Sequence, residues 1–326
     1  MTVAWDLHYD RRVSDGFLDH FLNGGVAHSL VEYARFAPYP LDLQMRHDPK
    51  TGAEHATLYV GLTSVLGVKR KKDLLQLEGH KSPAAAECGF QADWAKPMTA
   101  EELRTVWRAV EDYLEAIIPI AAAKHASKEG AVQAAASVFS SNKRIMVDRE
   151  VALHFKDVAT KKRIFAEITA PLVTAIKGIP GVPGKPPASF GGECDLLALD
   201  RDGRLLAVEV KPRATGTLVW SGVQATVYAR LFERWIQAPP RGTDAAATIL
   251  RGMLEQRARL GLAPTSRPGI AERPIVVPIV AIQRGASATA LERMRKVQAA
   301  LLEAGCGDPN FEIYEVNMTG RMDRLG

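Results

Sequence analysis

Two apolar strands joined by a short polar turn constrain this chain more than any other feature of its sequence. Residues 193–199 (ECDLLAL) and 204–211 (RLLAVEVK) are rich in Leu, Ala and Val, and residues 200–203 (DRDG) separate them. A turn that ends in Gly between two such runs is a β-hairpin signal. A three-residue hairpin loop requires the left-handed conformation at its last residue, which Gly adopts without steric cost. We therefore predict a hairpin with Gly203 in that position.

The register of this hairpin brings charged side chains together. Counting outward from the turn, Asp195 lies opposite Glu209, and Lys211 lies two residues beyond Glu209 on the same face. Directly opposed residues have Cβ atoms about 4.5–5.5 Å apart. Two carboxylates about 5 Å apart repel each other by roughly 3 kcal/mol at an effective dielectric of about 20. Such a pair favours a proton or a cation, and Mg²⁺ is a cation that binds through one or two carboxylates.

The alternative for these charges is an ordinary solvated face, because a lone Glu-x-Lys triplet is common in a chain of 326 residues. Two observations favour a site. The triplet at 209–211 ends a strongly apolar strand, and Asp195 interrupts the first strand at the matching position.

A predicted helix over residues 219–236 follows, in which Gln224 and Tyr228 lie one turn apart on the same face. The aspartate, the hairpin, the Glu-x-Lys triplet and the Gln-x-x-x-Tyr helix together resemble the PD-(D/E)XK nuclease superfamily, particularly its RecB-like branch. The resemblance covers about residues 190–235 and implies a restriction-endonuclease-like αβββαβ core. A helix over 157–177 before the hairpin and a buried strand over 274–283 after it fit that order.

The resemblance also implies roles for individual residues. Asp195 and Glu209 would bind Mg²⁺ or Mn²⁺, Lys211 would assist the attacking water, and Gln224 would help to hold the site. The remaining candidates for substrate binding are Tyr228 and Arg213. Arg213 follows the triplet closely enough to meet a phosphate, and a plain surface arginine is the equal alternative.

Some positions depart from the family pattern. Cys194 stands where the pattern has Pro, and the first core strand is not obvious, so residues 144–155 are expected to serve instead. Many members carry an acidic residue on the first helix. Glu167 is the first candidate for it by topology, and Glu150 is the second. Glu193 shares a strand face with the aspartate and is a further candidate carboxylate, although a residue that simply begins the strand is the commoner case.

Length and pattern predict two domains. Residues 1–141 form an α+β N-terminal domain, with a hairpin over 41–68 and an amphipathic helix capped by Thr99 that continues, Ala-rich, to about residue 139. A polar stretch after the basic run at 69–72 is predicted to be loop. Residues 142–326 form the α/β nuclease-like domain. We expect its first helix to be interrupted or kinked at Pro171. The Gly- and Pro-rich residues 178–192 are expected to form a connecting loop before the hairpin.

Composition narrows the function classes. Lys and Arg number 42 and Asp and Glu 37, a net charge of +5 that permits nucleic-acid binding without requiring it. Basic clusters at 69–72 and 161–163 could contact phosphates, although a solvated face is commoner. Three scattered cysteines exclude a disulfide framework and favour a reducing cytoplasm. We find no signal peptide or apolar membrane segment, and no motif of an ATP-driven motor, a nicotinamide enzyme or a serine hydrolase.

The function expected from the sequence is a metal-dependent nuclease that hydrolyses phosphodiester bonds, of DNA rather than RNA, in defence or repair. The first alternative is a catalytically silent nuclease-like fold that binds nucleic acid or protein. The second is a regulatory or assembly protein whose N-terminal domain does the work. That domain leaves three roles open, namely nucleic-acid binding, a protein partner and homodimerisation, and the choice between endo and exo cleavage is open too.

Overall fold

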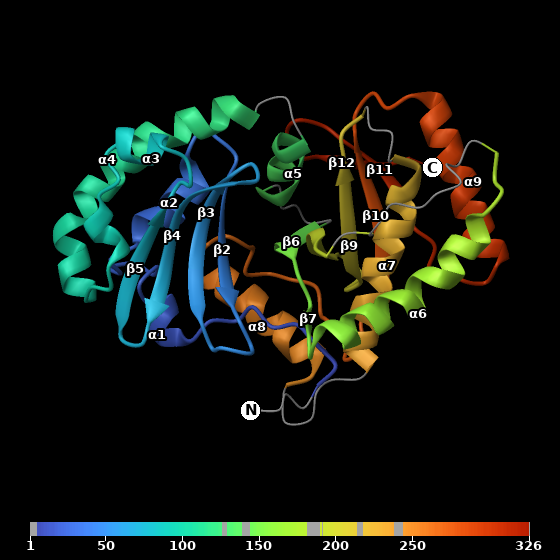
Figure 1. Cartoon of the computed structure of the whole chain (residues 1–326), viewed down its shortest axis with the longest axis horizontal. Coiled ribbons are helices and arrows are strands. Elements are labelled where there is room, and N and C mark those ends of the chain that lie inside the picture. Colours follow the sequence, from blue (N-terminus) through green and yellow to red (C-terminus); the bar gives the residue numbers. More distant parts are fainter. Residues whose placement is uncertain are drawn as a thin grey trace. The chain divides into compact units, whose positions relative to one another are not determined.

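The computed structural model describes residues 5–125, 129–138, 144–180, 190, 192–213, 218–237 and 244–325. These residues form a mixed α/β protein with several sheets (Figure 1). The chain divides into two compact units, and each unit is built from separate segments. Unit 1 comprises Met1–Tyr9, Phe139–Arg251 and Ser266–Gly326, and unit 2 comprises Asp10–Val138 and Gly252–Thr265. Met1–Tyr9 is thus grouped with C-terminal residues, and Gly252–Thr265 is grouped with N-terminal residues. No pattern in the sequence predicted this exchange of segments.

A twisted sheet forms the centre of unit 1, with the strand order β12-β11-β10-β9-β8-β6 among the described residues. Its strands are β6 (Arg144–Val151), β8 (Cys194–Asp200), β9 (Leu205–Lys211), β10 (Val276–Gln283), β11 (Glu312–Val316) and β12 (Met322–Arg324). The strands β6, β8 and β9 are antiparallel neighbours, whereas β10 runs parallel to both β9 and β11. The guanidinium of Arg144 on one edge strand donates to the carbonyl of Gly320, in the turn before the other edge strand, at 3.1 Å.

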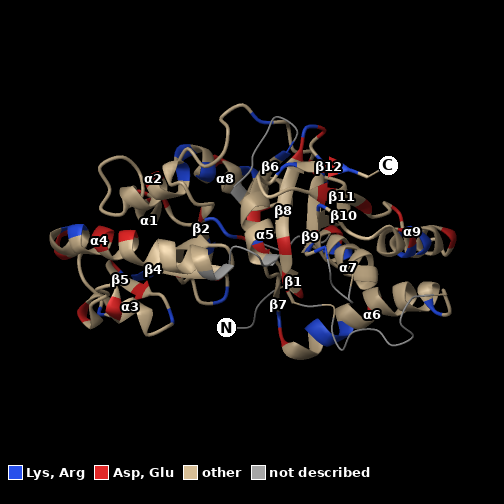
Figure 2. Cartoon of the chain, turned by 90° about the horizontal axis from the view of Figure 1, so that it is seen from above, with Lys and Arg blue, Asp and Glu red and all other residues tan. Residues whose placement is uncertain are grey.

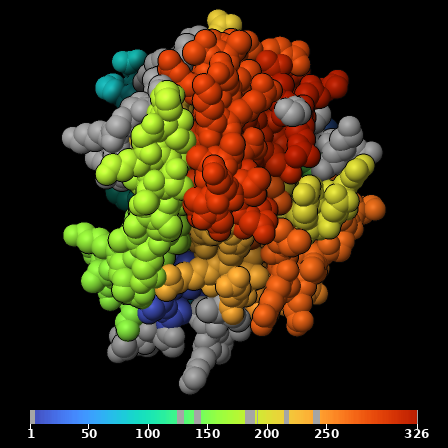
Figure 3. Space-filling model, turned by 90° about the vertical axis from the view of Figure 1, so that its right-hand side faces the viewer, coloured from blue at the N-terminus to red at the C-terminus, as the bar shows by residue number. Residues whose placement is uncertain are grey.

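Three long helices accompany this sheet: α6 (Val158–Ile176), α7 (Leu218–Gln237) and α9 (Ala288–Glu303). Helix α7 packs against β9 and β10, and α6 and α9 pack against α7. Figure 3 shows α6 and α9 side by side on one face. Helix α7 is buried along most of its length because apolar residues occur on nearly all its sides. Asp157 caps α6 by accepting from the Thr160 amide at 2.7 Å.

Helix α6 continues through Pro171 as one helix, so of the predicted interruption or kink the interruption does not occur. Proline lacks the N–H of one intrahelical hydrogen bond, and the apolar residues on either side, Ile164 and Leu172, are buried and keep the helix in place. The short strands β1 (Leu7–His8) and β7 (His154–Phe155) pair with each other beside α7. Helix α8 (Ala246–Arg259) begins in unit 1 and ends in unit 2.

Unit 2 contains an antiparallel sheet in the order β2-β3-β4-β5. The strands β2 (Leu41–His47) and β3 (Glu54–Val60) confirm the predicted hairpin. The next strands are β4 (Thr63–Lys71) and β5 (Leu74–Gly79), so the loop predicted after the basic run is wrong in its first residues. Leu75 and Leu77 are buried on β5, which pairs with β4 across a tight turn at Lys72.

The basic run at 69–72 is partly compensated by carboxylates. Lys69 pairs with Glu78 at 2.9 Å, and Arg70 pairs with Glu54 at 3.0 Å. Helix α4 (Ala100–His125) begins as predicted, because Thr99 and Glu102 exchange hydrogen bonds in a capping box. Helix α5 (Glu129–Val138) follows, and the unit also contains α1 (Asp15–Leu18), α2 (His28–Phe36), α3 (Ala84–Glu87) and the 3₁₀ turn η1 (Ala92–Ala95).

Within the described part of the chain, no helix has the length and apolar character needed to cross a membrane.

Candidate active site on the β8–β9 hairpin

The hairpin that carries the candidate site has the predicted register. Leu196 pairs with Val208 and Leu199 pairs with Leu205, and continuing this register places Asp195 opposite Glu209. Gly203 has a φ of 76°, the left-handed conformation that the turn requires. A Cβ at this position would also lie 2.3 Å from the carbonyl oxygen of Gly269. Both backbone conformation and space therefore require glycine here.

The turn is held by the side chain of Asp200 as well as by its backbone. Its carboxylate accepts from the amides of Asp202 and Arg204, each at 2.9 Å, and pairs with the Arg204 guanidinium at 2.7 Å. A carboxylate that accepts several local N–H groups fixes the loop geometry. This fixed loop sets the register by which the far ends of the two strands bring their charges together.

Asp195, Glu209 and Lys211 form the charged centre of the hairpin. The carboxylate of Asp195 is half-buried and accepts from the backbone N–H of Val210 at 2.6 Å. Glu209 is 0% exposed, and the ammonium of Lys211, whose side chain is 14% exposed, forms an ion pair with it. The structure thus places these three predicted residues together at one end of β8 and β9.

The net formal charge of this centre is negative, because two carboxylates face one ammonium. Burial raises the pKa of the neighbouring Cys194 thiol well above its usual value, and Asp195 and Glu209 raise it further. The thiol therefore stays protonated at neutral pH and is a poor nucleophile. The groups at this end of the hairpin therefore suit the binding of a cation by carboxylate oxygens better than nucleophilic catalysis by the thiol.

Gln224 and Tyr228 lie on α7, which packs against β9. The Gln224 amide donates to the Tyr228 hydroxyl at 3.2 Å, and that hydroxyl donates to the carbonyl of Phe190 at 2.9 Å. Burial raises the pKa of Tyr228, and the charge of Glu209 raises it further, so the phenol remains neutral. Because Tyr228 is only 1% exposed, its geometry favours holding the chain before β8 over the substrate contact expected from the sequence.

Arg213 and Glu193 are exposed next to the charged centre. The backbone N–H of Arg213 donates to the side chain of Gln283 at 3.4 Å, and no carboxylate of the described residues forms an ion pair with its guanidinium. Arg213 is therefore available to a phosphate. Glu193 lies two residues before Asp195, just outside β8.

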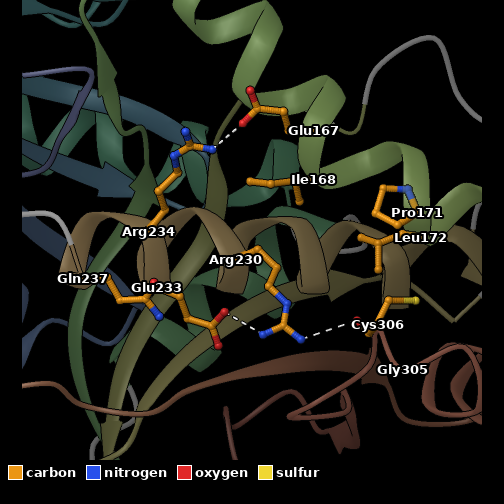
Figure 4. Close-up of a pocket in the computed structure, with 10 residues that line it drawn as sticks. All are labelled: Glu167, Ile168, Pro171, Leu172, Arg230, Glu233, Arg234, Gln237, Gly305 and Cys306. Atoms are coloured by element: carbon orange, nitrogen blue, oxygen red, sulfur yellow. Dashed lines mark hydrogen bonds and ion pairs between the residues drawn. The ribbon is translucent and has the colours of Figure 1, made fainter.

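Glu167 does not join the candidate site. Its carboxylate pairs with Arg234 at 2.6 Å and with Arg163 at 2.9 Å, and these two bonds lower its pKa. It lines a pocket of about 570 Å³ between α6, α7 and the end of α9 (Figure 4). Sequence reasoning missed this pocket because its walls are distant in the chain: Glu167, Ile168, Pro171, Leu172, Arg230, Glu233, Arg234, Gln237, Gly305 and Cys306.

Glu150 lies on β6 between two paired residues, since Arg149 pairs with Leu196 and Val151 pairs with Cys194. This register puts Glu150 level with Asp195. Its φ of 48° is unusual for a residue with a side chain and follows an irregularity in the pairing of β6.

The donor set of the charged centre fits a hard divalent cation. No group of three or more His, Cys, Asp and Glu side chains is arranged to hold a metal within the described ranges. Mg²⁺ nevertheless needs only one or two carboxylates when water and a substrate phosphate supply the other ligands. Asp195 and Glu209 provide that number and type of ligand.

A comparison of this chain with models of protein families, with curated proteins and with solved structures found no match.

Proposed function

We propose that the protein is a metal-dependent nuclease whose active site is formed by Asp195, Glu209 and Lys211, with Mg²⁺ or Mn²⁺ as cofactor and DNA as the favoured substrate. The observation that carries the proposal is the fully buried Glu209 paired with Lys211, beside an Asp195 held in place by the Val210 amide. A buried carboxylate is expensive to maintain, and such groups are concentrated at functional sites.

The topology supports a restriction-endonuclease-like core. The antiparallel strands β6, β8 and β9, followed through α7 by the parallel strand β10, give the strand neighbours that the expected core requires. Strand β6 lies beside β8, where the family's first strand belongs. It departs from the expected order in one respect, because β6 precedes α6 in the chain instead of following it.

The chain's own groups have distinct tasks in this proposal. Asp195 and Glu209 would hold the cation, and the Val210 N–H keeps the Asp195 carboxylate in one orientation. A cation bound there would supply the chemistry of lowering the pKa of a ligated water and stabilising the charge that develops on the phosphate. Lys211, which pairs with Glu209, would help to orient the attacking water. Gln224 borders the site from α7, fixed by its bond to Tyr228.

The test is cleavage of plasmid, linear duplex, single-stranded DNA and RNA by the purified full chain, with Mg²⁺, Mn²⁺ or EDTA. Asp195→Asn is the sharpest variant, because the amide oxygen still accepts from Val210 while the negative charge is lost. Asp202→Asn, the same change at an exposed residue of the same hairpin, is its matched control. We expect metal-dependent cleavage that Asp195→Asn abolishes and Asp202→Asn retains. Full activity of Asp195→Asn would refute the assignment.

The second candidate function is a nuclease-like fold that binds nucleic acid or protein without cleaving it. The observation in its favour is that Lys211 already pairs with Glu209 inside the protein, so the Glu209 carboxylate has a positive partner without a metal ion. Tight binding of nucleic acid in EDTA, with no cleavage of any substrate in either metal, would favour this function over the first.

A further inference from the structure

The first turns of α6 carry three consecutive basic residues, Lys161, Lys162 and Arg163, and Figure 2 shows blue on the ribbon at the start of this helix. All three residues are exposed. Arg163 pairs with Glu167 at 2.9 Å and with Asp6 at 3.0 Å, so carboxylates compensate its charge. Neither Lys161 nor Lys162 has a carboxylate partner among the residues that the structure describes. Two uncompensated ammonium groups therefore remain on this turn.

Lys161 differs from Lys162 in how its ammonium is placed. Its Nζ lies 5.6 Å from the centroid of the Phe165 ring and 5.8 Å from that of the Phe155 ring. Both distances lie within the range of a cation–π interaction. The same Nζ lies 3.3 Å from the position that a Cβ on Gly192 would occupy. Two rings and the backbone at Gly192 thus border the exposed ammonium, and no such contacts are seen for Lys162 in the described ranges.

Gly192 connects this ammonium to the candidate active site. It lies three residues before Asp195, and three residues of chain span at most about 11 Å. Successive phosphates of one strand of B-DNA rise by 3.4 Å along the helix axis and, because the strand winds about that axis, lie farther apart than this in space, so the distance spans fewer than three phosphates. A strand whose scissile phosphate lies at Asp195 therefore has further phosphates within reach of Lys161.

We infer that Lys161 binds a backbone phosphate of the nucleic-acid strand that enters the Asp195 site, close to the scissile one. The inference rests on the proposed nuclease function and extends it to a substrate contact outside the metal site. An ammonium is a compact point charge that suits a single phosphate oxygen. The rings of Phe155 and Phe165 restrict its position, so less freedom is lost on binding.

The experiment measures equilibrium binding of the full-length protein to a labelled duplex and a labelled single strand over a range of KCl concentrations. The background is Asp195→Asn, which keeps the substrate intact. Adding Lys161→Ala should weaken binding and should reduce the slope of log K against log salt by about 0.9 for a duplex or about 0.7 for a single strand. Lys162→Ala should change the slope by less than half as much, and Lys161→Arg should retain it.

A second readout uses the protein with its active site intact. Lys161→Ala should raise KM for cleavage and leave kcat unchanged, because the contact lies away from the reacting phosphate. Gly192→Ala should give part of this effect by displacing the ammonium, and should add nothing to Lys161→Ala when the two are combined. Thermal unfolding checks that each variant is folded.

The outcomes separate this inference from the proposal on which it rests. If the unaltered protein cleaves nucleic acid but Lys161→Ala keeps its salt slope and KM, the phosphate contact is refuted and the nuclease function stands. If Lys161→Ala and Lys162→Ala have equal effects, binding depends on general surface charge and the inference also fails. If the unaltered protein neither cleaves nor binds nucleic acid, both are refuted.

Discussion

The ion pair of Glu209 with Lys211 predicts a large, specific loss of stability when only the cation is removed. Lys211→Met keeps the length of the side chain and deletes its charge, so Glu209 would be left 0% exposed and without its ammonium. Breaking a buried pair in this way typically destabilises a protein by about 3–5 kcal/mol. Because the Lys211 side chain is 14% exposed, we expect the lower end, about 3 kcal/mol.

Thermal unfolding followed by Trp fluorescence and by far-UV circular dichroism measures this loss. In a domain of 150–250 residues each kcal/mol shifts Tm by about 2–4 °C, so Lys211→Met should lower the transition of unit 1 by roughly 6–12 °C. Glu209→Gln/Lys211→Met should recover most of the loss, since neither charge remains. Together with the single variant Glu209→Gln, these two variants complete a double-mutant cycle that gives the coupling energy of the pair.

Lys296→Met provides the matched control. Lys296 pairs with Glu292 at 2.9 Å one turn apart on α9, with side chains 51% and 66% exposed. An exposed pair of this kind contributes about 0.3–0.5 kcal/mol, so the control should shift Tm by no more than about 2 °C. If Lys211→Met is as mild as Lys296→Met, Glu209 is not a buried charge that depends on Lys211, and the reasoning about this site fails.

Two further predictions concern hydrogen bonding and pH. Tyr228→Phe should lower the free energy of unfolding by about 1–3 kcal/mol, because it leaves the Phe190 carbonyl without its donor; a loss below about 0.5 kcal/mol in urea titration would contradict this. Burial, and then the charges of Arg46 and Lys69, lower the pKa of His55 to about 4. The unfolded chain protonates this residue near pH 6.5, so it binds more protons than the folded chain between pH 6.5 and 4, and stability should fall as the pH is lowered through this window. After allowance for partial exposure the loss is about 2 kcal/mol, and His55→Gln should remove it; an unchanged pH dependence in that variant would assign the effect to other groups.

Local chemistry explains which parts of the fold were predictable. The turn that ends at Gly203 specified the hairpin and its register, because Gly203 is the residue of this turn that adopts the left-handed conformation without steric cost. Thr99 and Glu102 specified the start of α4 by a capping box. Strand β5 was missed because its six residues follow a basic run, and only pairing with β4 buries its alternate leucines.

For the candidate site too, the features that adjacent residues determine were predictable and those that distant packing determines were not. The opposition of Asp195 and Glu209 follows from counting along two adjacent strands, which is local information. The burial of Tyr228 and the commitment of Glu167 to two arginines depend on how distant helices pack, and no pattern within either segment records this. The ring contacts that place Lys161 likewise join β7 to α6 and became visible only in three dimensions.

The exchange of segments between the two units has a consequence for how this polypeptide can be inherited or engineered. Tyr9 belongs to unit 1, where its hydroxyl donates to the buried Asp148 at 2.7 Å and its ring packs edge-on against Phe232 and Trp235. In unit 2, Gln256 bonds to the backbone of Val13 in both directions. A gene cut at residue 139 would deprive each product of part of its own interior. Each unit is thus compact in space but is encoded by separate stretches of the gene. A single crossover point therefore cannot transfer either unit whole.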